Sequence, residues 1–462
     1  MSVRQAILGL LLALSLVPLA GGSLAWQDGA SEEGNEAQSQ FPGVPLAQPS
    51  YDTLRVASNG ETLPYHVWVD WVPELVTTPD GGAWTFFGAQ TRLGDGPASR
   101  RLFASRFDPD LRVWLPAEAL PGDRVQFGPA AVADSQGRVH LVYSELTPDD
   151  AGKGSTLLYA RFDADGARSE PIAVASDPAA GFQMMPALAA DAADRVHAVW
   201  RDQRGVSAEA RAALPANADL YGSALVDGTW STAEPVTVRE ADDVSAAWPL
   251  LAVDGDRLVA VWSLYRGTTE EEMKTAFRVE WSSRSTDGSG GWSPARPIVE
   301  QRDDEIGGRL IDLAGSDAGV AVIYGRFARA TNQLALKRLP PGGDEWSADV
   351  ALSAGDYGYL PTMAMTSEGR AFVVYNTRRT RNVEIGAISV LPEGTGTAAV
   401  TLTASEDGVQ ARAAVALDAA GRPWVVYMHQ PVGSSAATEI RTLRGIAVGP
   451  VIELATATPT AP

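Results

Sequence analysis

Four arginines of this chain occupy a similar position in consecutive sequence repeats. Each follows, within four residues, an aromatic residue that ends an apolar run, and they are Arg204, Arg266, Arg326 and Arg378. A guanidinium binds a carboxylate or sulfate through two parallel hydrogen bonds, and an aromatic ring offers a flat apolar face to a sugar. Trp248 and Tyr359 precede apolar runs in the same region. These six residues are the candidate ligand-binding set, and an acid-bearing sugar would suit them.

The alternative is that these arginines are ordinary solvated loop charges. The chain contains 37 lysines and arginines, so some coincidence of position is expected. Nearby acids such as Asp202 and Glu145 could also hold them within loops. The sequence alone leaves both interpretations open.

No other residues form a recognisable catalytic or metal-binding pattern. His140 and His197 fill a repeat position that other copies give to tryptophan, valine, alanine or phenylalanine, which predicts a packing role. The chain has no zinc-ligand spacing, no Gly-x-Ser-x-Gly turn and no phosphate-binding glycine loop. Paired acids such as Asp242 and Asp243 predict solvated loops, with a calcium site as the alternative. We therefore assign no catalytic residue, no metal ligand and no cofactor.

The arginines belong to a repeat that returns seven times. Each copy has an apolar run, a turn built on Asp or Gly, and a second apolar run that ends in a marker aromatic. The marker aromatics are Phe87, Tyr143, Trp200, Trp262, Tyr324, Tyr375 and Tyr427. They lie about 50 to 60 residues apart with four strand-like runs per interval, which is typical of a propeller blade. The sequence therefore predicts an all-β fold, a seven-bladed β-propeller of four-stranded antiparallel blades.

The first two runs of a repeat are apolar on both alternating faces, as in residues 139–143. Such runs indicate inner strands that pack between two neighbouring blades. The alanine-rich copies contain strong helix formers, but turn residues interrupt them after five or six positions, which favours strands. We expect residues 53–57 to close the ring by pairing with the last repeat, because an open ring would leave bare strand edges.

A second recurring element places a tryptophan after a Gly/Asp turn, late in the repeat. The copies contain Trp114, Trp230, Trp292 and Trp346. An aspartate there can accept hydrogen bonds from turn amides, while the indole packs into the blade. These four tryptophans are predicted to be mostly buried.

One copy of this element resembles the Asp-box hairpin of the sialidase-like (BNR) propellers. That motif reads Ser-x-Asp-x-Gly-x-x-Trp, and Ser285, Asp287 and Trp292 match it, with Ser289 in the place of the glycine. The resemblance implies the propeller architecture. It does not carry over an activity, because the Arg-Ile-Pro segment of the sialidases is absent, and Tyr265 with Glu270 or Glu271 is only a candidate for their Tyr–Glu pair.

Composition limits the partners and the compartment. The formal charge is −20, which argues against sequence-independent binding to nucleic acid or to an anionic membrane. The chain has no cysteine, so disulfides and thiolate chemistry are excluded.

The ends of the chain predict its organisation. Residues 1–25 read as a signal peptide cleaved before Trp26, or as an uncleaved membrane anchor. Residues 26–52 read as an acidic, proline-punctuated linker, 53–455 as the propeller and 456–462 as a flexible tail. Export to a bacterial periplasm, cell surface or exterior follows from the signal and the absence of cysteine.

These observations favour an exported binding module that presents one face to an extracellular glycan or protein. One alternative is a glycoside hydrolase or lyase that acts on an acidic sugar, and another is a structural subunit of an envelope assembly. A funnel lined by arginine with a Tyr–carboxylate pair would favour the enzyme. A shallow face with an aromatic rim would favour binding.

Overall fold

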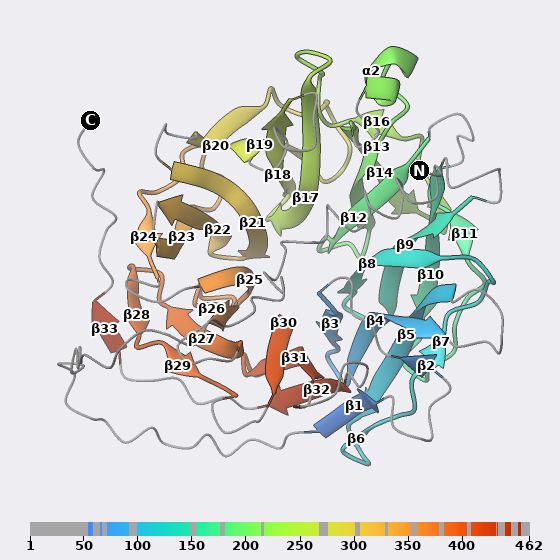
Figure 1. Ribbon diagram of the computed structural model, residues 1–462, viewed down its shortest axis with the longest axis vertical. Coiled ribbons are helices and arrows are strands. Elements are labelled where there is room, and N and C mark those ends of the chain that lie inside the picture. Colours follow the sequence, from blue (N-terminus) through green and yellow to red (C-terminus); the bar gives the residue numbers. More distant parts are fainter. Residues whose placement is uncertain are drawn as a thin grey trace, which may run out of the picture.

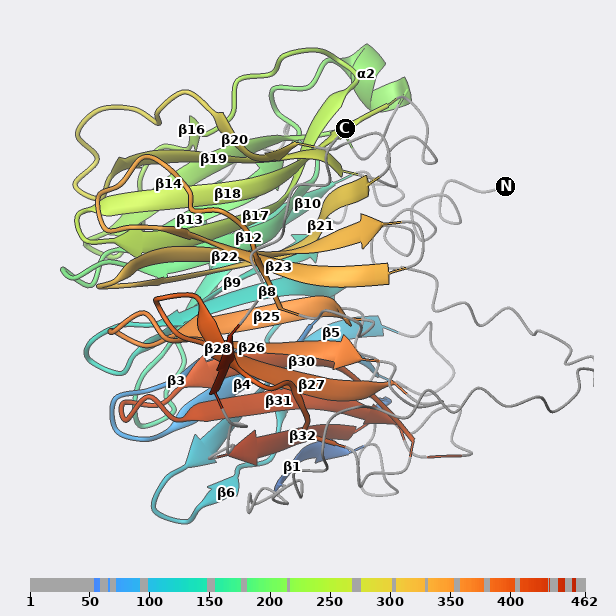
Figure 2. The ribbon, with the colours of Figure 1, turned by 90° about the vertical axis from the view of Figure 1, so that its left-hand side faces the viewer.

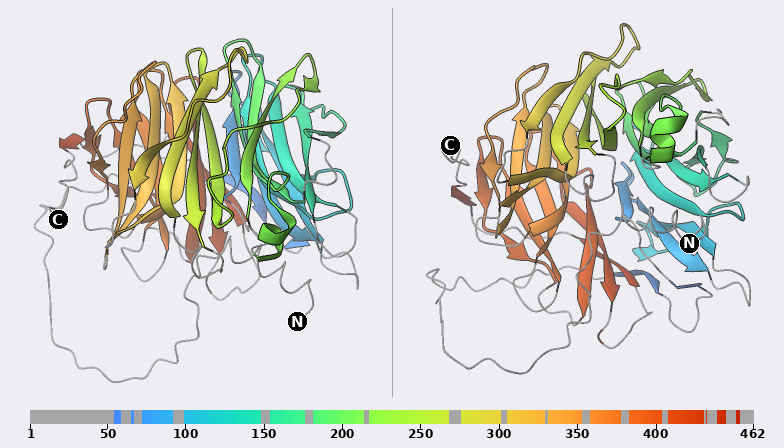
Figure 3. Two further views of the ribbon diagram at one scale, coloured as in Figure 1. Left: turned by 90° about the horizontal axis from the view of Figure 1, so that it is seen from above. Right: turned by 45° about the horizontal axis from the view of Figure 1, so that its top comes forward.

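The computed structural model of the chain describes residues 54–58, 65–66, 72–91, 99–147, 154–175, 181–213, 217–267, 276–300, 305–328, 331–352, 358–377, 383–403, 408–430, 432, 439–444 and 451–453. Seven antiparallel sheets surround a central axis (Figure 1), and the side view shows the strands running roughly along that axis (Figure 2). The predicted seven-bladed propeller is confirmed. The described part of the chain contains one helix, α2 (Ala208–Ala213), which stands at one face of the ring (Figure 3).

The blades follow one another along the chain, and each begins with its innermost strand. Blade 1 contains β3 (Glu74–Thr77), β4 (Ala83–Thr91), β5 (Ser99–Asp108), β6 (Val113–Trp114) and β7 (Glu118–Ala119), with β2 (Tyr65–His66) paired to β4. Blade 2 contains β8 (Gln126–Ala133), β9 (Val139–Leu146), β10 (Ser155–Phe162) and β11 (Ile172–Ala173). Blade 3 contains β12 (Gln183–Ala190), β13 (Val196–Asp202), β14 (Asp219–Val226), β15 (Thr229–Trp230) and β16 (Glu234–Pro235).

The remaining blades repeat this plan. Blade 4 contains β17 (Val244–Asp254), β18 (Arg257–Arg266), β19 (Ala276–Ser285) and β20 (Arg296–Glu300). Blade 5 contains β21 (Glu305–Ser316), β22 (Gly319–Ala328), β23 (Thr331–Leu339) and β24 (Val350–Ala351). Blade 6 contains β25 (Gly358–Met365), β26 (Ala371–Thr377), β27 (Glu384–Val390), β28 (Thr395–Thr397) and β29 (Val400–Thr401), and blade 7 contains β30 (Val409–Leu417), β31 (Pro423–Gln430) and β32 (Glu439–Arg444).

The N-terminal strand closes the ring. β1 (Leu54–Ser58) pairs antiparallel with β32 and becomes the outermost strand of blade 7, as expected. This pairing joins the first and last parts of the propeller and covers the edge of β32. A further strand, β33 (Val451–Glu453), pairs with β28 at the outer edge of blade 6.

The core lies between neighbouring blades. The seven marker aromatics all lie on the second strands of their blades and are almost completely buried. Phe87, for example, packs in one cluster with Trp424 and Val426 of blade 7, and Tyr143 packs with Trp84 of blade 1. Because each second strand contributes apolar side chains to two interfaces, its sequence is apolar on both faces.

The late-repeat tryptophans pack on the outer parts of these clusters. Trp114 is buried, with 9% of its surface exposed, whereas Trp230, Trp292 and Trp346 are half-buried. The expectation that all four are mostly buried therefore holds fully only for Trp114. Each of the other three still packs against a core cluster.

The Asp-box copy forms a turn between β19 and β20. The Ser285 hydroxyl and the Ser289 N–H both donate to Oδ1 of Asp287, at 2.8 and 2.7 Å. Hydrogen bonding by the side chain and the N–H of Ser289, and then by Ser285, lowers the pKa of Asp287 to about 2. The Asp-box spacing thus encodes a local turn.

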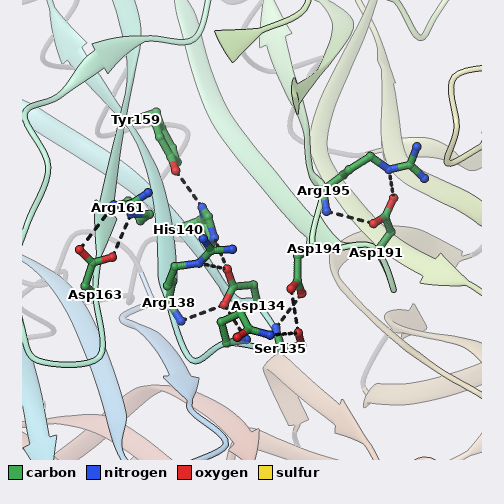
Figure 4. Close-up of polar contacts among 11 residues, drawn as sticks. Asp134, Ser135, Arg138, His140, Tyr159, Arg161, Asp163, Asp191, Asp194 and Arg195 are labelled. Atoms are coloured by element: carbon green, nitrogen blue, oxygen red, sulfur yellow. Dashed lines mark hydrogen bonds and ion pairs between the residues drawn. The ribbon is translucent and has the colours of Figure 1, made fainter. Parts of the chain in front are cut away.

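Turns between the first and second strands form a repeated polar network (Figure 4). Oδ1 of Asp134 accepts hydrogen bonds from two N–H groups of its own turn, and Oδ2 lies 3.1 Å from Nε2 of His140. Blade 3 repeats this arrangement, with His197 Nε2 3.0 Å from Asp191. Burial lowers the pKa of both histidines. Their predicted place within the blade is confirmed, although each is hydrogen-bonded to an acid as well as packed.

The predicted signal peptide (1–25), linker (26–52) and tail (456–462) lie outside the described residues. Within the described residues, no helix is long and apolar enough to cross a membrane.

Candidate functional site: the arginine and aromatic rim

The predicted arginines follow strands that end at one edge of the ring. In blade 3 the end of β13 at Asp202 pairs with the start of β12 at Gln183, and in blade 4 Arg266 pairs with Val244. Blade 6 shows the same register between Thr377 and Gly358. The ends of second strands and the beginnings of innermost strands therefore share one face, which we call the rim face.

The innermost strands carry a β-bulge close to the rim face. At the bulges of blades 2, 3, 4, 6 and 7 one residue has a left-handed backbone, with φ between 50° and 58°: Gly128, Met185, Trp248, Leu360 and Arg412. Four of these are not glycine, so the conformation costs energy that the surrounding sheet must offset. Its recurrence in five blades indicates an architectural role, because a bulge interrupts the bare inner edge of each blade.

The bulge of blade 4 positions Trp248 on the rim face. The indole is half-buried and packs against Phe127, Phe182 and Met185 of blades 2 and 3. On its other side it packs against Tyr265. Trp248 thus remains partly exposed while its neighbours fix its position.

Tyr359 lies at the corresponding bulge of blade 6 but is buried. Its exposed fraction is 7%, and it packs with Val383 and Ala411, the latter on blade 7. The structure therefore gives Tyr359 a packing role between blades. A role as an exposed sugar-stacking platform does not fit this burial.

Arg204 is held by a buried acid and an aromatic ring. Its Nη2 lies 2.7 Å from Oδ2 of Asp202, and its guanidinium carbon lies 4.6 Å from the centroid of the Tyr221 ring. Asp202 is fully buried and also accepts hydrogen bonds from Gln183 Nε2 and Trp200 Nε1. The guanidinium is therefore oriented before any ligand arrives.

Of the other three candidate arginines, only Arg266 has a side chain among the described residues. The Arg266 side chain is 56% exposed, and its Nε lies 3.7 Å from Oδ2 of the exposed Asp243. Arg326 lies on β22, but its side chain and the whole of Arg378 fall outside the described residues. The convergence of all four guanidiniums stays a prediction. The alternative that nearby acids hold these arginines is confirmed for Arg204, which pairs with Asp202, and Arg266 also lies beside an acid.

Sequence reasoning missed Arg201, a guanidinium beneath the rim. Its exposed fraction is 1%, its Nε donates to the carbonyl of Ala246 at 2.9 Å, and Nη2 lies 3.3 Å from the Ser245 hydroxyl. Its Nη1 lies 4.0 and 3.8 Å from the sulfur atoms of Met184 and Met185. Burial lowers the pKa of Arg201 to about 10. The one available signal was a charged residue directly after Trp200, where the apolar run ends.

A small cleft opens between blades 3 and 4 beside the rim. It has a volume of about 40 Å³, and its lining includes Asp219, Arg239, Trp262 and Glu280. Arg239 pairs with Asp219 at 2.9 Å, and Arg278 pairs with Glu280 at 3.0 Å. Burial raises the pKa of both acids. The cleft has room for water but not for a sugar ring.

Two acids lie on innermost strands, at the register position that directly follows the bulge in other blades. Glu74 on β3 pairs with Phe86, and Asp312 on β21 pairs with Ile323. Phe86 and Ile323 each precede the marker aromatic of their blade, so the two acids occupy equivalent positions. Burial, and after it the charge of Asp312, raises the pKa of Glu74. Among the described residues, no group of three or more potential ligands could hold a metal ion.

Comparisons with known proteins identify the fold. No protein-family model matches the chain, and no curated protein matches it. Among solved structures, a polysaccharide lyase, an ulvan lyase, matches with a TM-score of 0.55 and 10% identity, over 85% of this chain and 97% of that one. The same type of lyase bound to -[GlcA(1-4)Rha3S]- gives a TM-score of 0.56 at the same identity and coverage.

A sialidase is also among the similar structures. NanB of Streptococcus pneumoniae gives a TM-score of 0.45 at 10% identity, over 85% of this chain and 70% of that one. At such low identity these similarities show the fold alone. The propeller architecture that the Asp-box hairpin implied is confirmed by the seven sheets of the structure.

Proposed function

We propose that this protein is an extracellular saccharide-binding propeller whose ligand carries acid groups. The binding surface in this proposal is the part of the rim face formed by blades 3 and 4. The observation that carries it is Trp248, a partly exposed indole on the same edge as Arg204 and Arg266. A ring beside oriented guanidinium groups suits both stacking on a sugar and binding of its carboxylate or sulfate. The lyase complex with -[GlcA(1-4)Rha3S]- supports the choice of an acidic saccharide.

Calorimetric titration with an oligosaccharide of that composition tests the proposal. Trp248→Ala and the double variant Arg204→Ala/Arg266→Ala should each weaken binding about tenfold or more, because stacking and charge-assisted hydrogen bonds are lost. Added salt should weaken binding to the native chain more than binding to the double variant.

Arg422→Ala is the matched control. Arg422 is exposed and paired with Asp418 in a turn on the face opposite the rim, so it should leave binding unchanged. Equal losses in the control and the rim variants would contradict the proposal, and so would failure of the native chain to bind any uronate or sulfated glycan.

A second candidate function is cleavage of an acidic polysaccharide. The observation that favours it is the pair Glu74 and Asp312, whose pKa values are raised by burial to about 8 and about 7, near the pH at which a general acid and base are both effective. Release of new chain ends from ulvan by the native protein but not by Glu74→Gln would support cleavage. Binding without release would favour the binding module.

We also propose that the protein is exported. Residues 1–25 have the charged start, apolar run and small-residue end of a signal peptide. Mature protein from a bacterial host should begin at Trp26, and N-terminal sequencing of the periplasmic or culture fraction tests this. Protein retained in the membrane with an intact N-terminus would favour an anchor.

A further inference from the structure

We infer that Arg201 is a positioning residue: its buried guanidinium connects the bulges of blades 3 and 4 and thereby sets the orientation of the Trp248 indole. Arg201 lies beneath the rim face and is 1% exposed, so it acts on a ligand only through Trp248. The orientation of the indole can be measured without a ligand, whereas its effect on saccharide binding rests on the proposed function.

The guanidinium reaches the innermost strand of the next blade. Arg201 lies on β13 of blade 3, directly after the marker aromatic. Its Nε donates to the carbonyl oxygen of Ala246 at 2.9 Å, and its Nη2 donates to the Ser245 hydroxyl at 3.3 Å. The register shift of the β17 bulge starts after Ala247, so both contacts lie just before the bulge. Arg201 therefore holds the backbone from which Trp248 projects.

The same guanidinium also contacts the bulge of its own blade. Its Nη1 lies 4.0 Å from the sulfur of Met184 and 3.8 Å from that of Met185, whose backbone is left-handed with a φ of 54°. Both methionines belong to the apolar cluster against which the Trp248 indole packs. A thioether is a weak acceptor and a polarizable packing group. The indole thus rests on side chains whose sulfur atoms contact Arg201.

The neighbouring backbone supports the same junction. The N–H of Ala218 donates to the Ser245 hydroxyl at 3.1 Å, and the carbonyl oxygen of Ala218 accepts from the N–H of Ala246 at 3.0 Å. Ala218 directly precedes β14 of blade 3. We therefore expect blades 3 and 4 to stay paired without the guanidinium, with a looser contact at their bulges.

Blade 6 uses the equivalent residue in a similar way. Asn376 follows its marker aromatic as Arg201 does, and its Oδ1 accepts a hydrogen bond at 3.1 Å from the N–H of Arg412. Arg412 is the left-handed residue of the blade 7 bulge and stands where blade 4 has Trp248. In two blades, therefore, the residue after the marker aromatic binds the next blade at or beside its bulge. Arg201 differs because its longer side chain also contacts the bulge of its own blade.

An indole that is oriented in advance is the better stacking surface. Trp248 is half-buried, and the cluster below it supplies its order. A ring that is already oriented loses little conformational freedom when a sugar stacks on it, whereas a freely turning ring loses that freedom on binding. Arg201 should therefore raise the affinity for a saccharide without touching it.

Fluorine NMR of the full chain labelled with fluorotryptophan measures the orientation without a ligand. The Trp248 resonance is the one absent from Trp248→Phe. In Arg201→Met, which fills similar space without the hydrogen bonds, this resonance should move toward its position in the unfolded chain. Arg201→Lys keeps the charge but lacks the planar fork that reaches both bulges, so it should move the resonance as well. Ser245→Ala removes one acceptor and should move it less.

Arg338→Met is the matched control. Arg338 of blade 5 donates to the carbonyl oxygens of Gly369, Val390 and Leu391 in blade 6, at 2.8, 3.2 and 3.4 Å. These groups lie at the end of blade 6 opposite the rim. The control therefore removes a guanidinium between two blades, as Arg201→Met does. It should leave the Trp248 resonance and saccharide binding unchanged.

Calorimetric titration with the acidic oligosaccharide supplies the second readout. Arg201→Met should weaken binding by up to about tenfold, and Arg201→Met/Trp248→Ala should bind no more weakly than Trp248→Ala alone, because Arg201 acts through Trp248. An unchanged Trp248 resonance in Arg201→Met, a native resonance in Arg201→Lys, or additive losses in the double variant would overturn the inference. Native protein that binds no acidic glycan, but whose Trp248 resonance moves in Arg201→Met, would contradict the proposed function and still support Arg201 as the residue that orients the indole.

Discussion

At the scale of single residues, Asp202 organises the rim. Four donors converge on its buried carboxylate: the side chains of Arg204, Gln183 and Trp200, and the N–H of Arg204. Removing this carboxylate is costly, because the donors around it would be left without a hydrogen-bond acceptor.

Asp202→Ala should therefore destabilise the protein by about 3–5 kcal/mol, and Asp202→Asn by less, because the amide oxygen still accepts. Chemical denaturation measures both. Asp243→Ala removes the exposed partner of Arg266 and should cost less than about 1 kcal/mol. A similar cost for Asp202→Ala and Asp243→Ala would show that Asp202 is not the organising residue.

Two acids on innermost strands show why part of the candidate site could not be predicted from the sequence. Glu74 and Asp312 are equivalent in register, yet they stand at different distances from their marker aromatics, Phe87 and Tyr324. The turn that follows β3 is longer than the turn that follows β21, and this length difference hides the equivalence. Arg204, Arg266 and Trp248 were found because they directly adjoin the repeated apolar pattern.

At the scale of elements, the strands and their turns could be predicted, but the bulges could not. Apolar runs and Asp/Gly turns are visible in every repeat, and strand pairing follows from their order. The left-handed residues depend on backbone geometry near the axis. A weak signal exists, because Gly128, Met185, Trp248 and Leu360 each precede a proline, but proline has many other uses in loops.

The late-repeat hairpins give a prediction at this scale. Trp114→Ala should cost about 3–5 kcal/mol, since its indole is buried against Phe107 and Trp424. Trp292→Ala should cost about half as much, because that ring is half-buried. Thermal and chemical denaturation of both variants measure the difference. Equal costs would mean that exposure is not what separates the two hairpins.

At the scale of the whole molecule, stability depends on closing the ring. Blade 7 takes three strands from the end of the chain and one, β1, from its beginning. The β1–β32 register runs from the pair Leu54–Thr442 to the pair Ser58–Glu439. Without β1, the outer edge of β32 would lose its backbone partners, and blade 7 would depend on its contacts with blades 1 and 6 alone.

Two truncations isolate this effect. A chain that begins at residue 54 keeps β1, whereas a chain that begins at residue 59 lacks it, and the two differ by five residues. The shorter chain should unfold at a lower temperature and associate at high concentration, because its bare strand edge can pair with another copy. Scanning calorimetry and light scattering measure both properties. If the two chains melt together and stay monomeric, β1 does not close the ring in solution, and the contacts between blades 7 and 1 must hold it shut instead.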